Sequence, residues 1–159
     1  MAFNSAVQAN VQNVDGGELL VTAPYAVTSY DSFQDGLKIG RIAQIKAGVV
    51  SNLDGTSTPD ICGVVRRDVA NATVAGETIS ADYSLRADVV DFGRVTVFTA
   101  TGAVPTEGSA VYVINNTSAD AGKVTQNSSA TGALALTDVV FYKEVKAGVW
   151  TVTLKKFIK

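Results

Sequence analysis

The sequence predicts an all-β protein, an antiparallel β-barrel or β-sandwich with an extended N-terminal arm. Valine occurs 24 times and leucine only 8 times, and β-branched side chains suit a pleated strand better than a helix. Short runs alternate between apolar and polar residues, which is the two-residue period of a strand. Turn residues (Gly, Asn, Asp, Ser) recur at a spacing of roughly 8–12 residues, which is typical of antiparallel sandwiches and barrels.

The segment Val89–Asn115 reads as strand, turn, strand. Val95 and Val97 fall on one face of the first strand, because successive side chains point to opposite sides. Residues 101–108 contain two glycines and a proline, which break a strand, and residues 110–114 resume the alternation. We therefore predict a central hairpin here.

A second hairpin is predicted at the C-terminal end. Residues 139–145 and 149–157 have strand patterns and flank the turn Lys146-Ala147-Gly148. Alternation divides the last strand into two faces. The predicted core side carries Trp150, Val152 and Leu154.

Four further strands are predicted. Residues 37–45 also fit a helical row of isoleucines, but Gly40 would cost about 1 kcal/mol relative to alanine inside a helix. A strand is therefore preferred there. The other three strands are expected at 61–67, 83–88 and 123–126.

Residues 1–34 differ from the rest and are predicted to form an extended arm, with residues 35–159 as the β-domain. The arm contains no Lys or Arg, and a short edge strand is possible at 19–21. A frayed terminus is the competing interpretation. Several apolar side chains argue for a partner surface, either this chain's sheet or a neighbouring subunit: Phe3, Leu19, Leu20, Tyr25 and Tyr30.

Composition argues against most catalytic and nucleic-acid functions. The net charge is −2 and the chain has no histidine, so histidine triads and histidine metal sites are excluded. The single cysteine, Cys62, excludes an internal disulfide and is expected to be a buried thiol. Neither a signal peptide nor an 18-residue apolar stretch is present. We expect no enzyme activity, metal, nucleic acid or membrane partner.

Two pairs of carboxylates were considered as sites. Asp54 and Asp60 flank a polar loop, but they lack the spacing of a calcium loop, so a plain turn is preferred. Asp88 and Asp91 could suggest a glycosidase pair. Three residues apart in a strand, they are predicted to face opposite sides.

Several blocks in the β-domain resemble the structural cement, or head decoration, proteins of tailed bacteriophages. The resemblance extends over about residues 36–157 and lies in the order and spacing of glycine- and valine-containing blocks. These blocks are 40–45, 61–68, 89–97, 107–113, 122–125 and 148–154.

This resemblance implies a β-rich protein that binds the outer surface of an assembled capsid. Such proteins are commonly homotrimers at threefold positions and bridge neighbouring subunits against genome pressure, without catalysis or cofactor. The implied partners are the major capsid protein and other copies of the chain, as a homotrimer or possibly a dimer. The implied location is the outside of the virion, after synthesis in the cytoplasm of the host bacterium.

Charge is distributed unevenly between the two ends. Residues 1–37 have a net charge of −4 and residues 139–159 a net charge of +4. We hypothesise that the acidic arm lies on the capsid or along the basic terminal strand of a neighbour. Pairing within one chain, or simple solvation, is the alternative. The expected contact residues are Phe3, Asp15, Glu18, Leu19, Leu20, Tyr25, Tyr30, Arg66, Arg67, Lys155 and Lys156.

A second function remains open, a carbohydrate- or receptor-binding β-domain of a phage tail or surface adhesin. Trp150 and Tyr112 could form a stacking platform for a sugar. However, Trp150 shares its predicted face with Val152 and Leu154, which favours a place in the core.

Overall fold

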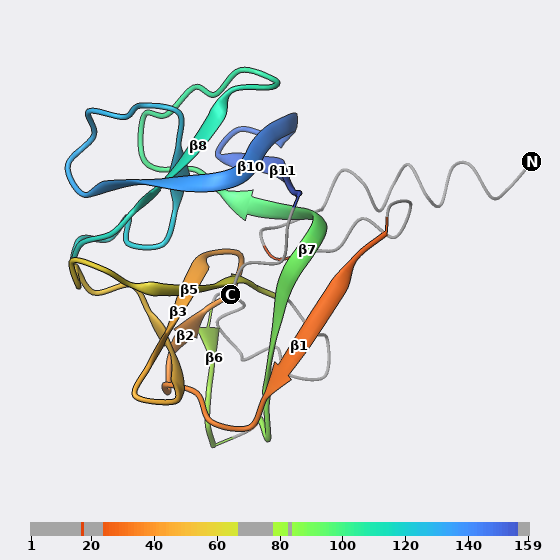
Figure 1. Ribbon diagram of the computed structural model, residues 1–159, viewed down its shortest axis with the longest axis vertical. Helices are drawn as coiled ribbons and strands as arrows, with labels where there is room; N and C mark the ends of the chain where they lie inside the picture. Colours follow the sequence, from red (N-terminus) through yellow and green to blue (C-terminus); the bar gives the residue numbers. More distant parts are fainter. Residues whose placement is uncertain (1–16, 18–23, 67–77, 83, 156–159) are drawn as a thin grey trace, which may run out of the picture.

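The computed structural model describes residues 17, 24–66, 78–82 and 84–155, and this part contains strands and loops but no helix (Figure 1). The all-β prediction is confirmed. The strands are β1 (Ala26–Tyr30), β2 (Leu37–Lys38), β3 (Ile42–Lys46), β4 (Val49–Asn52), β5 (Asp60–Val65), β6 (Thr78–Ile79), β7 (Ala87–Phe98), β8 (Ala110–Ile114), β9 (Val124–Thr125), β10 (Ala133–Lys146) and β11 (Val149–Leu154).

Nine strands form one antiparallel sheet. Its order is β4-β3-β5-β7-β11-β10-β8-β9, with β1 also paired to β7, while β2 and β6 form a separate pair. The sheet does not close into a barrel, and its bent arrangement is sandwich-like. The sandwich alternative therefore holds, and the closed-barrel alternative is wrong.

Strand β7 joins two lobes. Residues 87–92 pair with β1 and β5, whereas residues 93–98 pair with β11. We name β1–β6 with residues 87–92 the arm lobe, and β8–β11 with residues 93–98 the hairpin lobe. Figure 1 shows β7 running from the first lobe into the second. Gly93 lies at the junction with φ +105°, and a Cβ there would lie 2.5 Å from the carbonyl oxygen of Pro24. Only glycine fits this approach.

Two apolar clusters fill the molecule. The larger is centred on the hairpin lobe, where the rings of Phe141 and Trp150 meet edge to face at 5.6 Å. It includes Trp150, Val152 and Leu154, so the predicted core side of the last strand is confirmed. The smaller cluster lies in the arm lobe and contains Leu37, Ile39, Ala43, Val50, Cys62, Val65, Ile79, Ala87 and Val89.

The C-terminal hairpin is confirmed as β10–β11, but the predicted central hairpin is wrong. Strands β7 and β8 both exist, yet β11 and β10 lie between them in the sheet. Strand β11 pairs with β7, and β10 pairs with β8. The two strands of the later hairpin therefore separate β7 from β8. Local alternation predicts each strand but not which strands pair.

Two other predictions need correction. Residues 84–86 lie outside the strand, which begins at Ala87. The predicted strand at 37–45 is divided into β2 and β3 around Gly40, whose φ is +70°. This left-handed conformation suits glycine and interrupts the strand.

Part of the predicted arm segment is built into the sheet. Residues 26–30 form β1 and pair with β7. Earlier in the arm, the amide of Gly17 donates a hydrogen bond of 2.6 Å to the carbonyl oxygen of Thr96 in β7. The possible strand at 19–21 lies outside the described residues.

Candidate interaction surface

Two large aliphatic side chains are strongly exposed at the two ends of β7. Leu85, just before the strand, is 94% exposed, and Val104, in the loop after it, is 79% exposed. Single exposed apolar residues are common on protein surfaces. What sets these two apart is the hydrogen bonding that holds each of them.

Hydrogen bonds fix the turn that presents Leu85. The amide of Ser84 donates to the carbonyl oxygen of Ser80 at 3.0 Å, and its hydroxyl donates to the carbonyl oxygen of Arg86 at 2.6 Å. Leu85 therefore projects from a closed turn.

The loop that carries Val104 is held by Gln126. The Gln126 amide nitrogen donates to the Val104 carbonyl oxygen at 3.0 Å. The Gln126 side-chain oxygen accepts hydrogen bonds from the backbone and the hydroxyl of Thr106, each at 3.0 Å. Pro105, between them, is buried. Val104 is thus also presented in a defined position.

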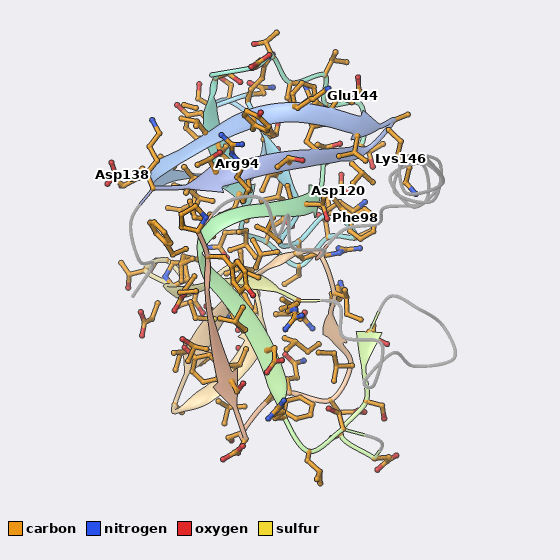
Figure 2. All side chains as sticks on the ribbon, turned by 90° about the vertical axis from the view of Figure 1, so that its right-hand side faces the viewer. Arg94, Phe98, Asp120, Asp138, Glu144 and Lys146 are labelled. Atoms are coloured by element: carbon orange, nitrogen blue, oxygen red, sulfur yellow. The ribbon has the colours of Figure 1, made fainter. Side chains whose placement is uncertain are left out.

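Tyr25 is a third exposed apolar side chain, 49% exposed, and lies against Gly93. Beside it is a groove of about 460 Å³ lined by residues from β7 and β11, together with Pro24 and Lys155. The guanidinium of Arg94, labelled in Figure 2, lies 3.8 Å from the centre of the Tyr142 ring. The structure therefore brings two of the predicted contact residues, Tyr25 and Lys155, to the same region.

Asp88 forms a paired charge centre in the arm lobe. Its carboxylate lies 3.8 Å from Arg66 and 3.6 Å from Arg86, and it accepts a 2.6 Å hydrogen bond from the Ser29 hydroxyl. Arg66 was predicted to contact a capsid. Its side chain is 36% exposed, and it already has this internal partner.

Asp91 differs from Asp88 in its environment. One of its oxygens accepts a 2.8 Å hydrogen bond from the Thr28 hydroxyl, but the other, Oδ1, is buried without a hydrogen-bond donor. Thr28 and Ser29 are successive residues of β1, so they point to opposite sides of the sheet. Their partners Asp91 and Asp88 therefore do not share a site, which removes the glycosidase arrangement.

Tyr30 and Cys62 share the surroundings of Asp91. Burial raises the pKa of Tyr30, and the nearby Cys62, Asp91 and Asp60 raise it further. Burial also raises the pKa of Cys62 to about 12, so its thiol stays protonated at neutral pH. A protonated, buried thiol is neither a nucleophile nor a metal ligand, in agreement with the prediction of a buried structural cysteine.

The loop at Asp54 is closed by the protein's own donors. Asp54 accepts hydrogen bonds from Lys46, Thr56 and Gln44, and these bonds lower the pKa of its carboxyl group. Across residues 24–66, 78–82 and 84–155, no three His, Cys, Asp or Glu side chains group to hold a metal ion. In the same part of the chain, no helix is long and apolar enough to cross a membrane.

Seven predicted contact residues lie outside the described residues: Phe3, Asp15, Glu18, Leu19, Leu20, Arg67 and Lys156. Sequence reasoning missed Leu85, because its neighbours alternate as in a strand. It also missed Val104, although a valine among turn residues was a usable signal. Whether Asp91 Oδ1 has a hydrogen-bond donor depends on tertiary contacts, so the local sequence contains no signal for it.

Comparison with known proteins decides the family. A family model described as the XM1 gp53 minor capsid protein matches residues 5–156. The chain belongs to this family. It is therefore a member of a family of phage capsid structural proteins, which implies a non-enzymatic role.

A solved structure supports the same assignment. A chain from "The capsid of Myoviridae Phage XM1" is 40% identical to this chain, with a TM-score of 0.87. The match covers 99% of each chain. A search of curated proteins finds no match.

Proposed function

We propose that this protein binds the outer surface of a phage capsid and cements neighbouring major capsid protein subunits. Family membership supports a capsid structural role. The observation that carries the finer proposal is the placement of Leu85 and Val104 on two hydrogen-bonded loops, one before and one after β7.

A cement protein needs at least two separate contact points, because one contact can bind but cannot bridge. Strand β7 has 12 residues, which corresponds to at most about 40 Å when extended at roughly 3.3 Å per residue. Leu85 precedes the first residue of β7 and Val104 follows its last, so the two side chains lie in different lobes. Because hydrogen bonds already hold the residues next to Leu85 and Val104, little conformational entropy is lost when they bind.

The experiment is binding to capsids assembled without this protein. Leu85→Asp and Val104→Asp are each expected to weaken capsid affinity by about tenfold, since an apolar anchor in an interface contributes on this scale. Ser128→Asp, which adds the same charge to another exposed loop, should bind like the wild type. All three variants should unfold at the wild-type denaturant concentration.

The two-point arrangement makes a sharper prediction than affinity alone. At saturating concentration each single variant should occupy the capsid through its remaining contact, yet fail to raise the temperature at which the capsid disrupts. Wild-type affinity and wild-type stabilisation in both variants would show that these side chains are not the bridge.

The arm is a second part of the proposal. We propose that residues 1–34 contact the capsid or a neighbouring copy, and that the chain forms a homotrimer, with a dimer as the alternative. The charge asymmetry between residues 1–37 and 139–159 supports this. Deleting residues 1–16 retains Gly17 and β1. The deletion should reduce the number of subunits in the native oligomer or the capsid affinity. If both are unchanged, the arm makes neither contact.

One observation supports the carbohydrate-binding alternative, the groove beside Tyr25 and Arg94. Trp150 does not contribute, because it is only 8% exposed and lies in the core. Glycan binding abolished by Tyr25→Ala, in a protein that does not bind capsids, would favour this alternative.

A further inference from the structure

The arm lobe contains a pocket that takes no part in the proposed contacts at Leu85 and Val104. Its volume is about 400 Å³. Its walls carry the carboxylates of Asp60 and Asp91, the hydroxyls of Thr28 and Tyr30, and the aliphatic side chains of Ile45 and Ile61. The pocket is therefore acidic on one side and apolar on another.

Asp91 is the group that requires explanation. It is 7% exposed, and its Oδ1 has no hydrogen-bond partner. Leaving a buried carboxylate oxygen without a partner is costly, and native structures seldom do so without a reason. Asp88, three residues earlier, has two arginines and a serine around it. The chain thus neutralises one buried carboxylate and leaves the other unneutralised.

Basic side chains in the described part of the chain do not fill the role. Among the described residues, Lys46 pairs with Asp54, and Arg66 and Arg86 pair with Asp88. Across that same part of the chain, neither Asp91 nor Asp60 forms a salt bridge. A positive group from another molecule would supply the missing partner.

The lining favours a basic side chain over a metal ion. The described residues offer two carboxylates here and no group of three metal-ligating acidic, Cys or His side chains. A hard cation in a protein usually has six or more oxygen ligands. Lysine and arginine instead combine an aliphatic stem with a charged end. The stem matches Ile45 and Ile61, and the charged end matches Asp91 and Asp60.

We infer that this pocket receives a lysine or arginine side chain of the major capsid protein, with its charged end at the Asp60 and Asp91 carboxyl groups. The inference rests on the proposed function, because it names the chemistry of the same partner. It adds a recognition site in the arm lobe to the apolar contacts at Leu85 and Val104.

The test compares Asp91→Asn with Glu144→Gln on capsids assembled without this protein. Asn at 91 keeps an acceptor for Thr28 but removes the charge, so capsid affinity should fall by about tenfold or more. Glu144 is an exposed acid outside the pocket, and its variant should bind like the wild type. Wild-type affinity of Asp91→Asn would overturn the inference.

Stability separates this result from a folding defect. Because Asp91 forms no salt bridge among the described residues, Asp91→Asn should have an unfolding temperature equal to or above that of the wild type. A variant that binds weakly only because it unfolds would overturn the inference. A shift of the wild-type unfolding temperature by Ca²⁺ alone, lost in Asp91→Asn, would assign the pocket to a metal ion instead.

Failure of this inference is distinguishable from failure of the proposed function. If the wild type does not bind capsids, the proposed function is wrong. If the wild type binds and only the Leu85 and Val104 variants lose affinity, the proposed function stands and the pocket has no role in it.

Discussion

The two lobes share strand β7 but are stabilised by different kinds of contact. The hairpin lobe contains the Phe141–Trp150 aromatic pair within a large apolar cluster. The arm lobe contains a smaller cluster of aliphatic residues, and it also buries Gln44, Asp88 and Asp91. The polar residues buried in the hairpin lobe are threonines, so the lobes differ in that the arm lobe buries carboxyl groups.

This difference indicates a division of roles. Buried polar groups lower stability unless they are fully paired, so proteins tend to keep them where they serve binding or specificity. In this molecule the incompletely paired carboxylate lies in the arm lobe, beside an open pocket. We interpret the hairpin lobe as the rigid support for the apolar contact at Val104 and the arm lobe as the site of charge recognition.

The largest expected effect comes from breaking the aromatic core. Trp150→Ala should lower the free energy of unfolding by about 3–5 kcal/mol, because it leaves a cavity against Phe141. Cys62→Ala in the arm lobe removes only one atom and should cost about 1 kcal/mol. Urea denaturation measures both. A loss for Trp150→Ala as small as that for Cys62→Ala would contradict the role of the aromatic pair in the hairpin lobe.

The next comparison is between the two carboxylates of β7. Asp88→Asn removes the charge that pairs with Arg66 and Arg86 and should cost about 1–2 kcal/mol, because both arginines are partly exposed. Asp91→Asn should cost nothing or stabilise the protein. Thermal unfolding at low ionic strength measures the pair. A larger loss for Asp91→Asn would mean that Asp91 is neutralised in the folded protein.

Alkaline pH should weaken the arm lobe through Cys62. Burial raises the pKa of the Cys62 thiol from 9.0 to about 12 in the folded protein. Between these values the unfolded chain has lost the thiol proton and the folded chain has not, so stability falls as pH rises. The loss assigned to Cys62 should be about 1 kcal/mol per pH unit above 9. Cys62→Ala should remove this component from a denaturation series between pH 8 and 10, and identical pH dependence in both proteins would contradict it.

The smallest expected effect is a difference in stability between glycine variants of two hairpin turns of identical sequence. Lys-Ala-Gly-Val occupies 46–49 in the arm lobe and 146–149 in the hairpin lobe. Ala47 has φ +52°, whereas Ala147 has no positive φ, and a register shift accompanies the second turn. Ala47→Gly should therefore be neutral or stabilising by up to about 1 kcal/mol, while Ala147→Gly should destabilise by roughly 0.5–1 kcal/mol. Effects of the same sign and size would mean that both turns share one conformation.

These turns also show what the sequence could and could not predict. The β10–β11 hairpin was predicted because alternation and Gly148 are local signals. The same four residues adopt two backbone conformations, because the pairing of the flanking strands sets the turn. Similarly, β7 and β8 were predicted as strands but wrongly as partners, since β11 and β10 come from much later in the chain.

The candidate surface was predictable only in part. Tyr25 and Lys155 were expected as contacts and lie in one region, next to Gly93 and the groove. Leu85 was assigned to a strand because Tyr83, Leu85 and Ala87 alternate with polar residues, and only the turn at Ser84 reveals its exposure. The contacts of Asp88 and the missing hydrogen-bond donor at Asp91 Oδ1 depend on side chains from β1 and β5, which no local pattern specifies.

The central claim is that this protein stabilises an assembled capsid. The most direct measurement is the temperature at which capsids assembled without the protein disrupt, recorded with and without a saturating amount of the purified chain. We predict that bound protein raises this temperature, and that Leu85→Asp and Val104→Asp do so less. Saturating binding with no change in the disruption temperature would contradict the account, because the protein would then bind the capsid without cementing it.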